Sequence, residues 1–176
     1  MGLLKIARIG HPVLFQRAKP VDDPGAPEIR RLVADMIETM EDAPGVGLAA
    51  PQVHVSLRLF VFRVPESRAG GDDVIAPAVL INPEIEQISD EIMLCTEGCL
   101  SIPGMRGIVP RAARIRYRGV DLEGREIAAE ASGFHANVIQ HEYDHLDGIL
   151  YPMRLRDFTS FGYAEEFAKV AKGESQ

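Results

Sequence analysis

The chain has 176 residues, 46% of them hydrophobic, and its 26 acidic residues exceed its 19 lysines and arginines by seven charges. This length suits one domain with its own core, so residues 1–176 are predicted to form a single domain. The negative charge disfavours direct nucleic-acid binding, which depends on neutralising phosphates. No apolar run reaches the roughly 20 residues of a membrane span, and no secretory leader is recognised, so a cytoplasmic protein without membrane contact is expected.

The first half of the chain predicts one helix followed by several strands. Residues 27–41 carry apolar side chains at helical spacing, and Pro44 and two glycines then interrupt the helix. Residues 57–64 are apolar and β-branched, which is typical of a buried strand. Two further strands are predicted at residues 78–82 and 85–94.

The second half of the chain predicts an irregular segment, a hairpin and two helices. Residues 101–110 contain proline and glycine and are expected to be irregular, whereas 114–121 and 125–129 flank a likely turn. A short helix is predicted at about residues 158–170, with a frayed tail at 171–176. The chain thus has the order helix, mostly antiparallel strands, helix. This order predicts an α+β fold whose sheets pack around a central helix between Ser132 and Gly148.

A pair of histidines four residues apart marks that central helix. His141 and His145 enclose Glu142 in an H-E-x-x-H pattern, and residues i and i+4 share one helix face. Ser132 is a suitable N-cap, and Gly148 falls where glycine commonly ends a helix. Two imidazoles on one face can bind one metal ion, with the glutamate beside a water on that ion.

A catalytic metal commonly has three protein ligands, so a third is needed. The peptidase extension with a further histidine after the glycine fails, because position 151 is Tyr151. Glu165 and Glu166 are candidates, although their segment also reads as a solvated helix face. Cys99 is the other candidate, in a glycine- and proline-containing segment that indicates exposed backbone. The second cysteine, Cys95, is interpreted as a buried strand residue rather than a ligand.

Three segments together resemble the signature motifs of the peptide deformylase family, in that family's order. They are Gly-Val-Gly-Leu-Ala-Ala-Pro-Gln at 45–52, Glu-Gly-Cys-Leu-Ser at 97–101 and Gln-His-Glu-Tyr-Asp-His-Leu at 140–146. The likeness extends from about residue 6 to about residue 157. It implies a metal-dependent hydrolase that removes the N-formyl group from the initiator methionine of new polypeptides and releases formate.

The resemblance also implies the chemistry of the site. Cys99, His141 and His145 would hold one divalent ion, with Fe²⁺ favoured in the cell and Zn²⁺, Ni²⁺ or Co²⁺ able to substitute. Glu142 would act as base and then acid, and a rival structural zinc site would need a fourth ligand. The Gln52 side chain is expected to stabilise the oxyanion together with a backbone group, the N–H of Leu100.

The substrate is expected to be an extended nascent peptide that begins with formyl-methionine. The residues predicted to bind it are Val46, Gly47, Gly98, Phe134 and Val138. Asn137 departs from the family, in which many relatives carry an apolar residue, and Arg106 is interpreted as a solvated surface arginine. Transient contact with the ribosome is expected for an enzyme that acts on nascent chains, although the acidic charge gives this no support.

Overall fold

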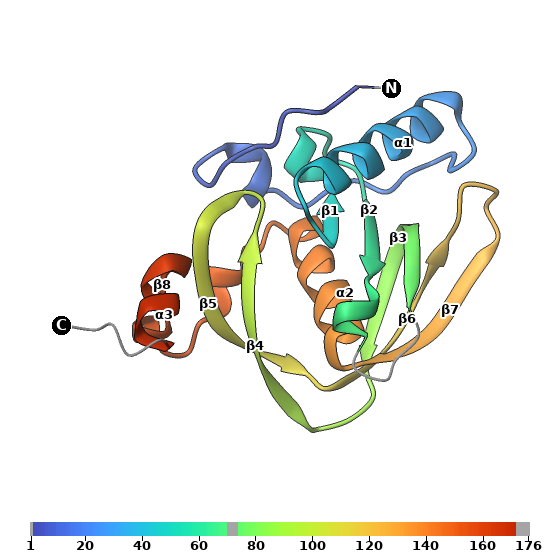
Figure 1. The fold of residues 1–176 in the computed structure, drawn as a ribbon. Helices are drawn as coiled ribbons and strands as arrows, with labels where there is room; N and C mark the ends of the chain where they lie inside the picture. Colours follow the sequence, from blue (N-terminus) through green and yellow to red (C-terminus); the bar gives the residue numbers. More distant parts are fainter. Residues whose placement is uncertain (1, 70–73, 172–176) are drawn as a thin grey trace.

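Two antiparallel sheets make up most of the fold in the computed structural model, which describes residues 2–69 and 74–171 (Figure 1). The five-stranded sheet has the order β1-β2-β3-β6-β7, and the three-stranded sheet has the order β4-β5-β8. The strands of the first sheet are β1 (Gly47–Ala49), β2 (Leu59–Val64), β3 (Ile75–Gln87), β6 (Arg114–Val120) and β7 (Glu126–Ser132). Those of the second are β4 (Ile92–Cys99), β5 (Ile102–Ala112) and β8 (Phe161–Tyr163).

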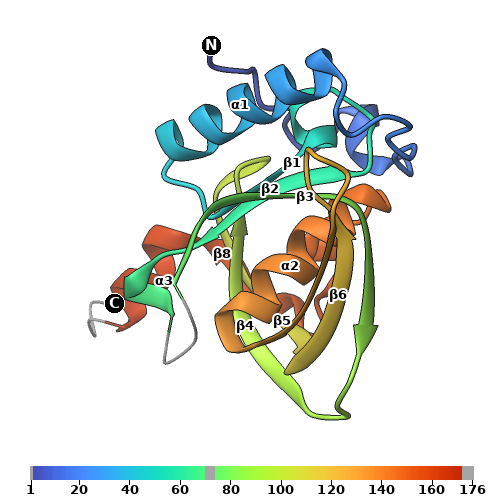
Figure 2. The ribbon, with the colours of Figure 1, turned by 90° about the vertical axis from the view of Figure 1, so that its right-hand side faces the viewer.

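Helix α2 (Gly133–Leu146) lies between the two sheets, as both ribbon views show (Figures 1 and 2). Ser132 is its N-cap residue in an extended conformation. Gly148 follows the helix with a φ of +73°, a left-handed conformation that side chains with a Cβ rarely adopt. One apolar cluster joins the helix to the five-stranded sheet and includes Phe60, Leu80, Ile115, Val138, Ile139 and Leu146. Burial of these side chains therefore fixes the position of the central helix.

Helix α1 (Pro27–Asp42) lies near β1 and β2 and completes the core on that side of the five-stranded sheet (Figure 1). Met36 and Met40 are fully buried there and pack in one cluster with Leu48 and Val61. Strand β2 is therefore covered on both faces, which explains why Leu59 to Phe62 are all apolar rather than alternating with polar residues.

Short helices occupy the remaining segments. The 3₁₀ turns span Pro12–Phe15, Ala50–Val53, Glu66–Arg68, Tyr151–Arg154 and Phe158–Ser160, and α3 spans Ala164–Ala171. Among the described residues, no helix is long and apolar enough to cross a membrane.

The α+β class, the two main helices and the β6–β7 hairpin agree with the sequence predictions, but two strand predictions were wrong. Residues 78–82 and 85–94 are not two separate strands, because β3 runs continuously through them to Gln87 and the next strand starts at Ile92. The strand is irregular at this point, because Asn82 has a φ of +50° and the pairing register with β6 shifts between Ile81 and Glu84. This irregularity lies where the sequence predicted a break between two strands. Residues 101–110, predicted to be irregular, belong mostly to β5, because pairing with β4 outweighs the weak strand propensity of glycine and proline.

The C-terminal helix also begins later than predicted. Residues 158–160 form a 3₁₀ turn, and Phe161 to Tyr163 pair with β5 as strand β8, so α3 starts only at Ala164. Phe161 packs into the cluster that contains Tyr151, and this burial favours a strand over an exposed helical turn. Ala171 ends α3, and the rest of the predicted frayed tail, residues 172–176, lies outside the described residues.

Candidate metal centre and active site

Three side chains from two elements converge beside α2. His141 and His145 lie one helical turn apart with ring centroids 5.1 Å from each other, and Cys99 ends strand β4. One ligand atom from each of the three lies within 4.8 Å of the other two. The Cys99 Sγ atom is 3.3 Å from Nε2 of His145. Strand and helix thus bring together residues that are more than 40 positions apart in the sequence.

The segment around Cys99 was interpreted as exposed backbone, which holds for Pro103 and Gly104 but not for Cys99, which is buried. Its exposed fraction is 9%, and it packs in a cluster with Leu14, Ile102 and Tyr151. Gly98 lies in β4 and Pro103 and Gly104 lie in β5, so only Leu100 and Ser101 connect the two strands. Cys95, predicted to be buried on a strand, lies on β4 but is only half-buried.

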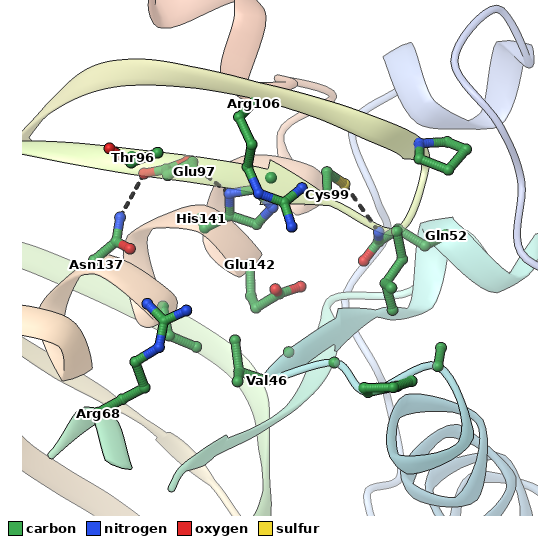
Figure 3. Close-up of a pocket in the computed structure, with 18 of the residues that line it drawn as sticks. Val46, Gln52, Arg68, Thr96, Glu97, Cys99, Arg106, Asn137, His141 and Glu142 are labelled. Atoms are coloured by element: carbon green, nitrogen blue, oxygen red, sulfur yellow. Dashed lines mark hydrogen bonds and ion pairs between the residues drawn. The ribbon is translucent and has the colours of Figure 1, made fainter. Parts of the chain in front are cut away.

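Gln52 lies directly against the cysteine sulfur. Its Nε2 donates to Cys99 Sγ at 3.3 Å and to the Ser101 hydroxyl at 3.1 Å, and its Oε1 accepts from the Ala49 N–H at 2.8 Å (Figure 3). The side chain is 1% exposed and comes from the 3₁₀ turn that follows β1. These contacts fix the amide at the edge of the three-residue cluster.

A buried network of charged side chains binds Nδ1 of His141. His141 Nδ1 donates to Glu97 Oε2 at 2.7 Å, which leaves Nε2 as the nitrogen available to a ligand. Arg111 donates to both oxygens of Glu97, through Nε at 2.7 Å and Nη2 at 2.9 Å, and through Nη1 to Asp144 at 2.6 Å. Asp144 also accepts from the half-exposed Arg154. Each buried charge in this network therefore has a partner of opposite sign.

The network sets the protonation states around the cluster. Burial alone would raise the pKa of Glu97, but the hydrogen bonds from Arg111 and His141 outweigh it and lower that pKa to about 2. Burial lowers the pKa of His145 well below its ordinary value, so this imidazole is neutral at pH 7. Burial opposes charge on His141 as well, but Cys99 and Glu97 raise its pKa well above the ordinary value.

Glu142 occupies the space in front of the cluster. It is 4% exposed, and burial raises its pKa to about 7. Its Oε2 atom has no hydrogen-bond partner among the residues that the structure describes. Gly47 lies against this side chain, and a Cβ at that position would overlap the carboxylate. A buried carboxyl group without a partner is costly, which points to a ligand or water as its natural contact.

The donor set fits a divalent transition metal. A thiolate and two imidazoles are ligands that zinc and iron accept, and three ligands leave a position open. Within residues 2–69 and 74–171, the group contains no fourth His, Cys, Asp or Glu, which disfavours a closed structural zinc site. Glu165 and Glu166, the alternative third ligands, are exposed on α3 and are not in the group.

A cavity of about 480 Å³ opens in front of these residues (Figure 3). It is bounded by the ends of two edge strands, with Gly47 from β1 on one side and Gly98 from β4 on the other. His145 lies buried behind it, 1% exposed. The other residues that the sequence predicts for the site all line the cavity: Val46, Gly47, Gln52, Gly98, Cys99, Leu100, Phe134, Val138, His141 and Glu142.

Other residues line the cavity although they were not predicted to bind there, among them Arg106, Arg68 and Asn137. Arg106 is exposed, as expected for a surface arginine, but its guanidinium lies over Gly98 and lines the cavity. Arg68 stands over the ring of Phe134, with its guanidinium carbon 5.2 Å from the ring centroid. Asn137 lines the same cavity and is 8% exposed.

Sequence reasoning missed Glu97, Arg111 and Asp144 as supports of the site. Glu97 stands two residues before Cys99 in the motif, and Asp144 lies between the two histidines, so both positions carried a signal. The sequence around Arg111 contained no such signal, because the role of Arg111 depends on β5 pairing with β4 and facing α2.

Replacing Arg111 with leucine is expected to lower the free energy of unfolding by about 3–5 kcal/mol. The substitution leaves the carboxylates of Glu97 and Asp144 buried beside each other without their shared cation. Urea unfolding of the metal-free protein, followed by circular dichroism, measures the effect.

The matched control is Arg116→Leu, which removes a surface arginine whose side chain is 53% exposed and which pairs with Glu130. This control is expected to leave the unfolding midpoint nearly unchanged. Equal midpoints for the two variants would show that the buried network does not support the fold.

Comparisons with known proteins agree with this geometry. The model of the family described as polypeptide deformylase matches residues 3–160. Peptide deformylase 1 of Bordetella pertussis is 52% identical over 161 residues, which cover 91% of this chain and 92% of that protein. Peptide deformylase 1 of Nitrosomonas europaea is 49% identical, with the same two coverages.

Solved structures show the same fold. The crystal structure of the peptide deformylase from Thermotoga maritima has a TM-score of 0.81 and 38% identity, and covers 89% of this chain and 100% of its own. The class I type b peptide deformylase from Acinetobacter baumannii with bound Met-Ala-Ser has a TM-score of 0.81 and 36% identity, and covers 88% and 99%. This chain therefore belongs to the peptide deformylase family, the metal-dependent hydrolases that remove the formyl group from the amino terminus of new polypeptides.

Proposed function

We propose that Cys99, His141 and His145 hold one divalent metal ion and that Glu142 moves the protons of formyl hydrolysis beside it. The observation that carries this proposal is the convergence of one sulfur and two ring nitrogens within 4.8 Å, next to a buried carboxylate oxygen without a hydrogen-bond partner in the described part of the chain. A divalent metal ion held by these three residues would lower the pKa of a water molecule and polarise the formyl carbonyl.

Glu142 is proposed as the general base and then the general acid. Its carboxylate accepts a proton from the attacking water as the new carbon–oxygen bond forms at the formyl carbon. The same proton then passes to the leaving nitrogen as the carbon–nitrogen bond breaks, which yields formate and a free amino terminus. Its pKa of about 7 suits both directions of transfer near neutral pH.

Gln52 and the backbone N–H of Leu100 are proposed to stabilise the oxyanion that forms in this reaction. Gln52 Nε2 lies 3.3 Å from the cysteine sulfur, and both residues line the cavity. One amide N–H of Gln52 would exchange its hydroxyl partner, Ser101, for the developing negative charge.

Replacing Gln52 with leucine is expected to lower kcat for formate release by about 10²–10³-fold, because one preorganised donor is lost. The measurement is steady-state formate release from a formyl-Met peptide, with the bound metal quantified in the same samples. A variant that keeps its metal and still turns over at the wild-type rate would remove Gln52 from the mechanism.

The cavity is proposed to bind the substrate as an extended chain. Val46, Phe134 and Val138 offer apolar walls for an unbranched methionine side chain, and Gly47 and Gly98 place backbone groups along the path of the peptide. The similar enzyme from Acinetobacter baumannii binds the peptide Met-Ala-Ser, which supports a methionine in the first position here.

Ferrous iron is proposed as the metal in the cell, with Zn²⁺, Ni²⁺ or Co²⁺ as substitutes. The mixed thiolate and imidazole set suits all four ions, and the family resemblance favours iron. Metal analysis of protein purified without oxygen, combined with a formate-release assay, tests this choice. Zinc as the sole metal in fully active anaerobic protein would contradict it.

Residues 1–176 are proposed to act as a single catalytic domain in the cytoplasm, where formylated chains are made. Transient contact with the ribosome is proposed because the substrate is a nascent chain. The net charge of −7 gives this contact no general attraction to RNA phosphates, so it would depend on a local surface.

A further inference from the structure

Asn137 is a polar residue in the wall of the cavity, which Val46, Phe134 and Val138 also line. It lies on α2 four residues before His141, about one helical turn away, and both residues line the cavity. Only 8% of Asn137 is exposed, so its amide cannot depend on bulk water for hydrogen bonds. The buried amide of Asn137 therefore needs a hydrogen-bond partner inside the protein.

That partner is Glu97. Asn137 Nδ2 donates to Glu97 Oε1, and the close-up shows this bond on the side of the carboxylate away from His141 (Figure 3). The same oxygen accepts from Arg111 Nε at 2.7 Å, while Oε2 accepts from Arg111 Nη2 at 2.9 Å and from His141 Nδ1 at 2.7 Å.

These four bonds use the full acceptor capacity of Glu97. A carboxylate offers about four lone-pair positions, two on each oxygen. Without Asn137, Oε1 would keep only Arg111 Nε while Oε2 would keep Arg111 Nη2 and His141 Nδ1, so the carboxylate would lose one of its four restraints and could rotate. Such a rotation would lengthen the bond to His141 Nδ1, which sets the orientation of that ring.

We propose that Asn137 is a positioning residue that holds Glu97 in the orientation in which it fixes His141 for metal binding. This inference rests on the proposed role of His141 as a ligand. Asn137 acts through Glu97 and not on the reacting atoms, so its loss should alter the metal site more than the affinity for substrate.

Asn137→Leu is the decisive variant, because leucine has a similar size and no donor. The metal-free protein is titrated with Co²⁺ against a competing chelator, and the visible absorption of the Co²⁺ form is recorded. We expect Co²⁺ to bind about 10–100-fold more weakly, with a changed absorption spectrum. With Co²⁺ at saturation, kcat for a formyl-Met peptide should fall while KM stays within about twofold.

Val138→Ala is the matched control. It changes the wall of the same cavity, one residue along the same helix, but makes no bond to Glu97. It is expected to raise KM and to leave Co²⁺ affinity and the spectrum unchanged. If Asn137→Leu fails to fold, Asn137→Ser gives the same test with a side chain too short to replace the amide.

The inference is overturned if the Asn137 variant binds Co²⁺ as tightly as the wild type with an identical spectrum. Cys99→Ala, measured in the same titration, separates this failure from that of the metal site itself. If Cys99→Ala also keeps full Co²⁺ affinity, the proposed ligand set is wrong. If it loses Co²⁺ while Asn137→Leu does not, only the role of Asn137 is rejected.

Discussion

Replacing Glu142 with alanine is expected to slow formate release from a formyl-Met peptide by about 10²–10⁴-fold while the protein keeps its metal. The variant keeps the three proposed ligands, Cys99, His141 and His145. Glu142 does not belong to the group of residues whose ligand atoms converge. The variant lacks the buried carboxylate whose Oε2 has no hydrogen-bond partner within residues 2–69 and 74–171. Steady-state kinetics and metal analysis of the same preparation measure the two quantities.

The pH dependence of the rate of formate release provides a second measurement on the same variant. Glu142 must be ionised to accept a proton, and burial raises its pKa to about 7. A nearby cation favours the ionised form and lowers that pKa. Wild-type activity should therefore fall as the pH drops through a value at or below about 7, and the residual rate of Glu142→Ala should lack this step.

Glu165→Ala is the control for this experiment, because it removes an exposed glutamate from α3. It should keep both the wild-type rate and the wild-type pH profile. If Glu142→Ala behaves like this control, Glu142 does not carry the proton.

Replacing Cys99 with alanine is expected to reduce bound metal to background and to abolish activity with it. A thiolate is the strongest ligand in the proposed set, and the two imidazoles alone form a weaker site. Metal content after gel filtration, together with formate release, provides the measurement.

Cys95→Ala is the matched control for Cys99→Ala, since it removes the other cysteine of the same strand, four residues away. Metal content should be unchanged in that variant. Metal loss on Glu165→Ala but not on Cys99→Ala would instead favour the alternative ligand set, with a carboxylate from α3.

The sequence predicted the parts of the site that depend on local spacing. His141, Glu142 and His145 are fixed relative to one another by one helix, and helical periodicity identifies that helix without knowledge of the sheets. The position of Cys99 next to them was predicted only through the family resemblance. Its distance from the histidines depends on how β4 packs on α2, which no local pattern specifies.

Two of the wrong predictions share a physical cause. Residues 101–110 contain two prolines and two glycines, and the strand at 161–163 is only three residues long, yet both become strands because β5 is paired on each side, by β4 and by β8. Arg111 and its two acidic partners were missed for a related reason. An arginine on a strand reads as a surface residue unless the helix that faces it is known.

The cavity between the edges of β1 and β4 has a consequence for timing within the cell. Each of these strands ends its sheet, so an incoming main chain can pair only if it is itself fully extended. An amino terminus that has already entered a helix or a folded core cannot present that shape. In the proposed extended binding mode, deformylation competes with folding of the first few residues, and slow folding of that segment lengthens the period in which the enzyme can act.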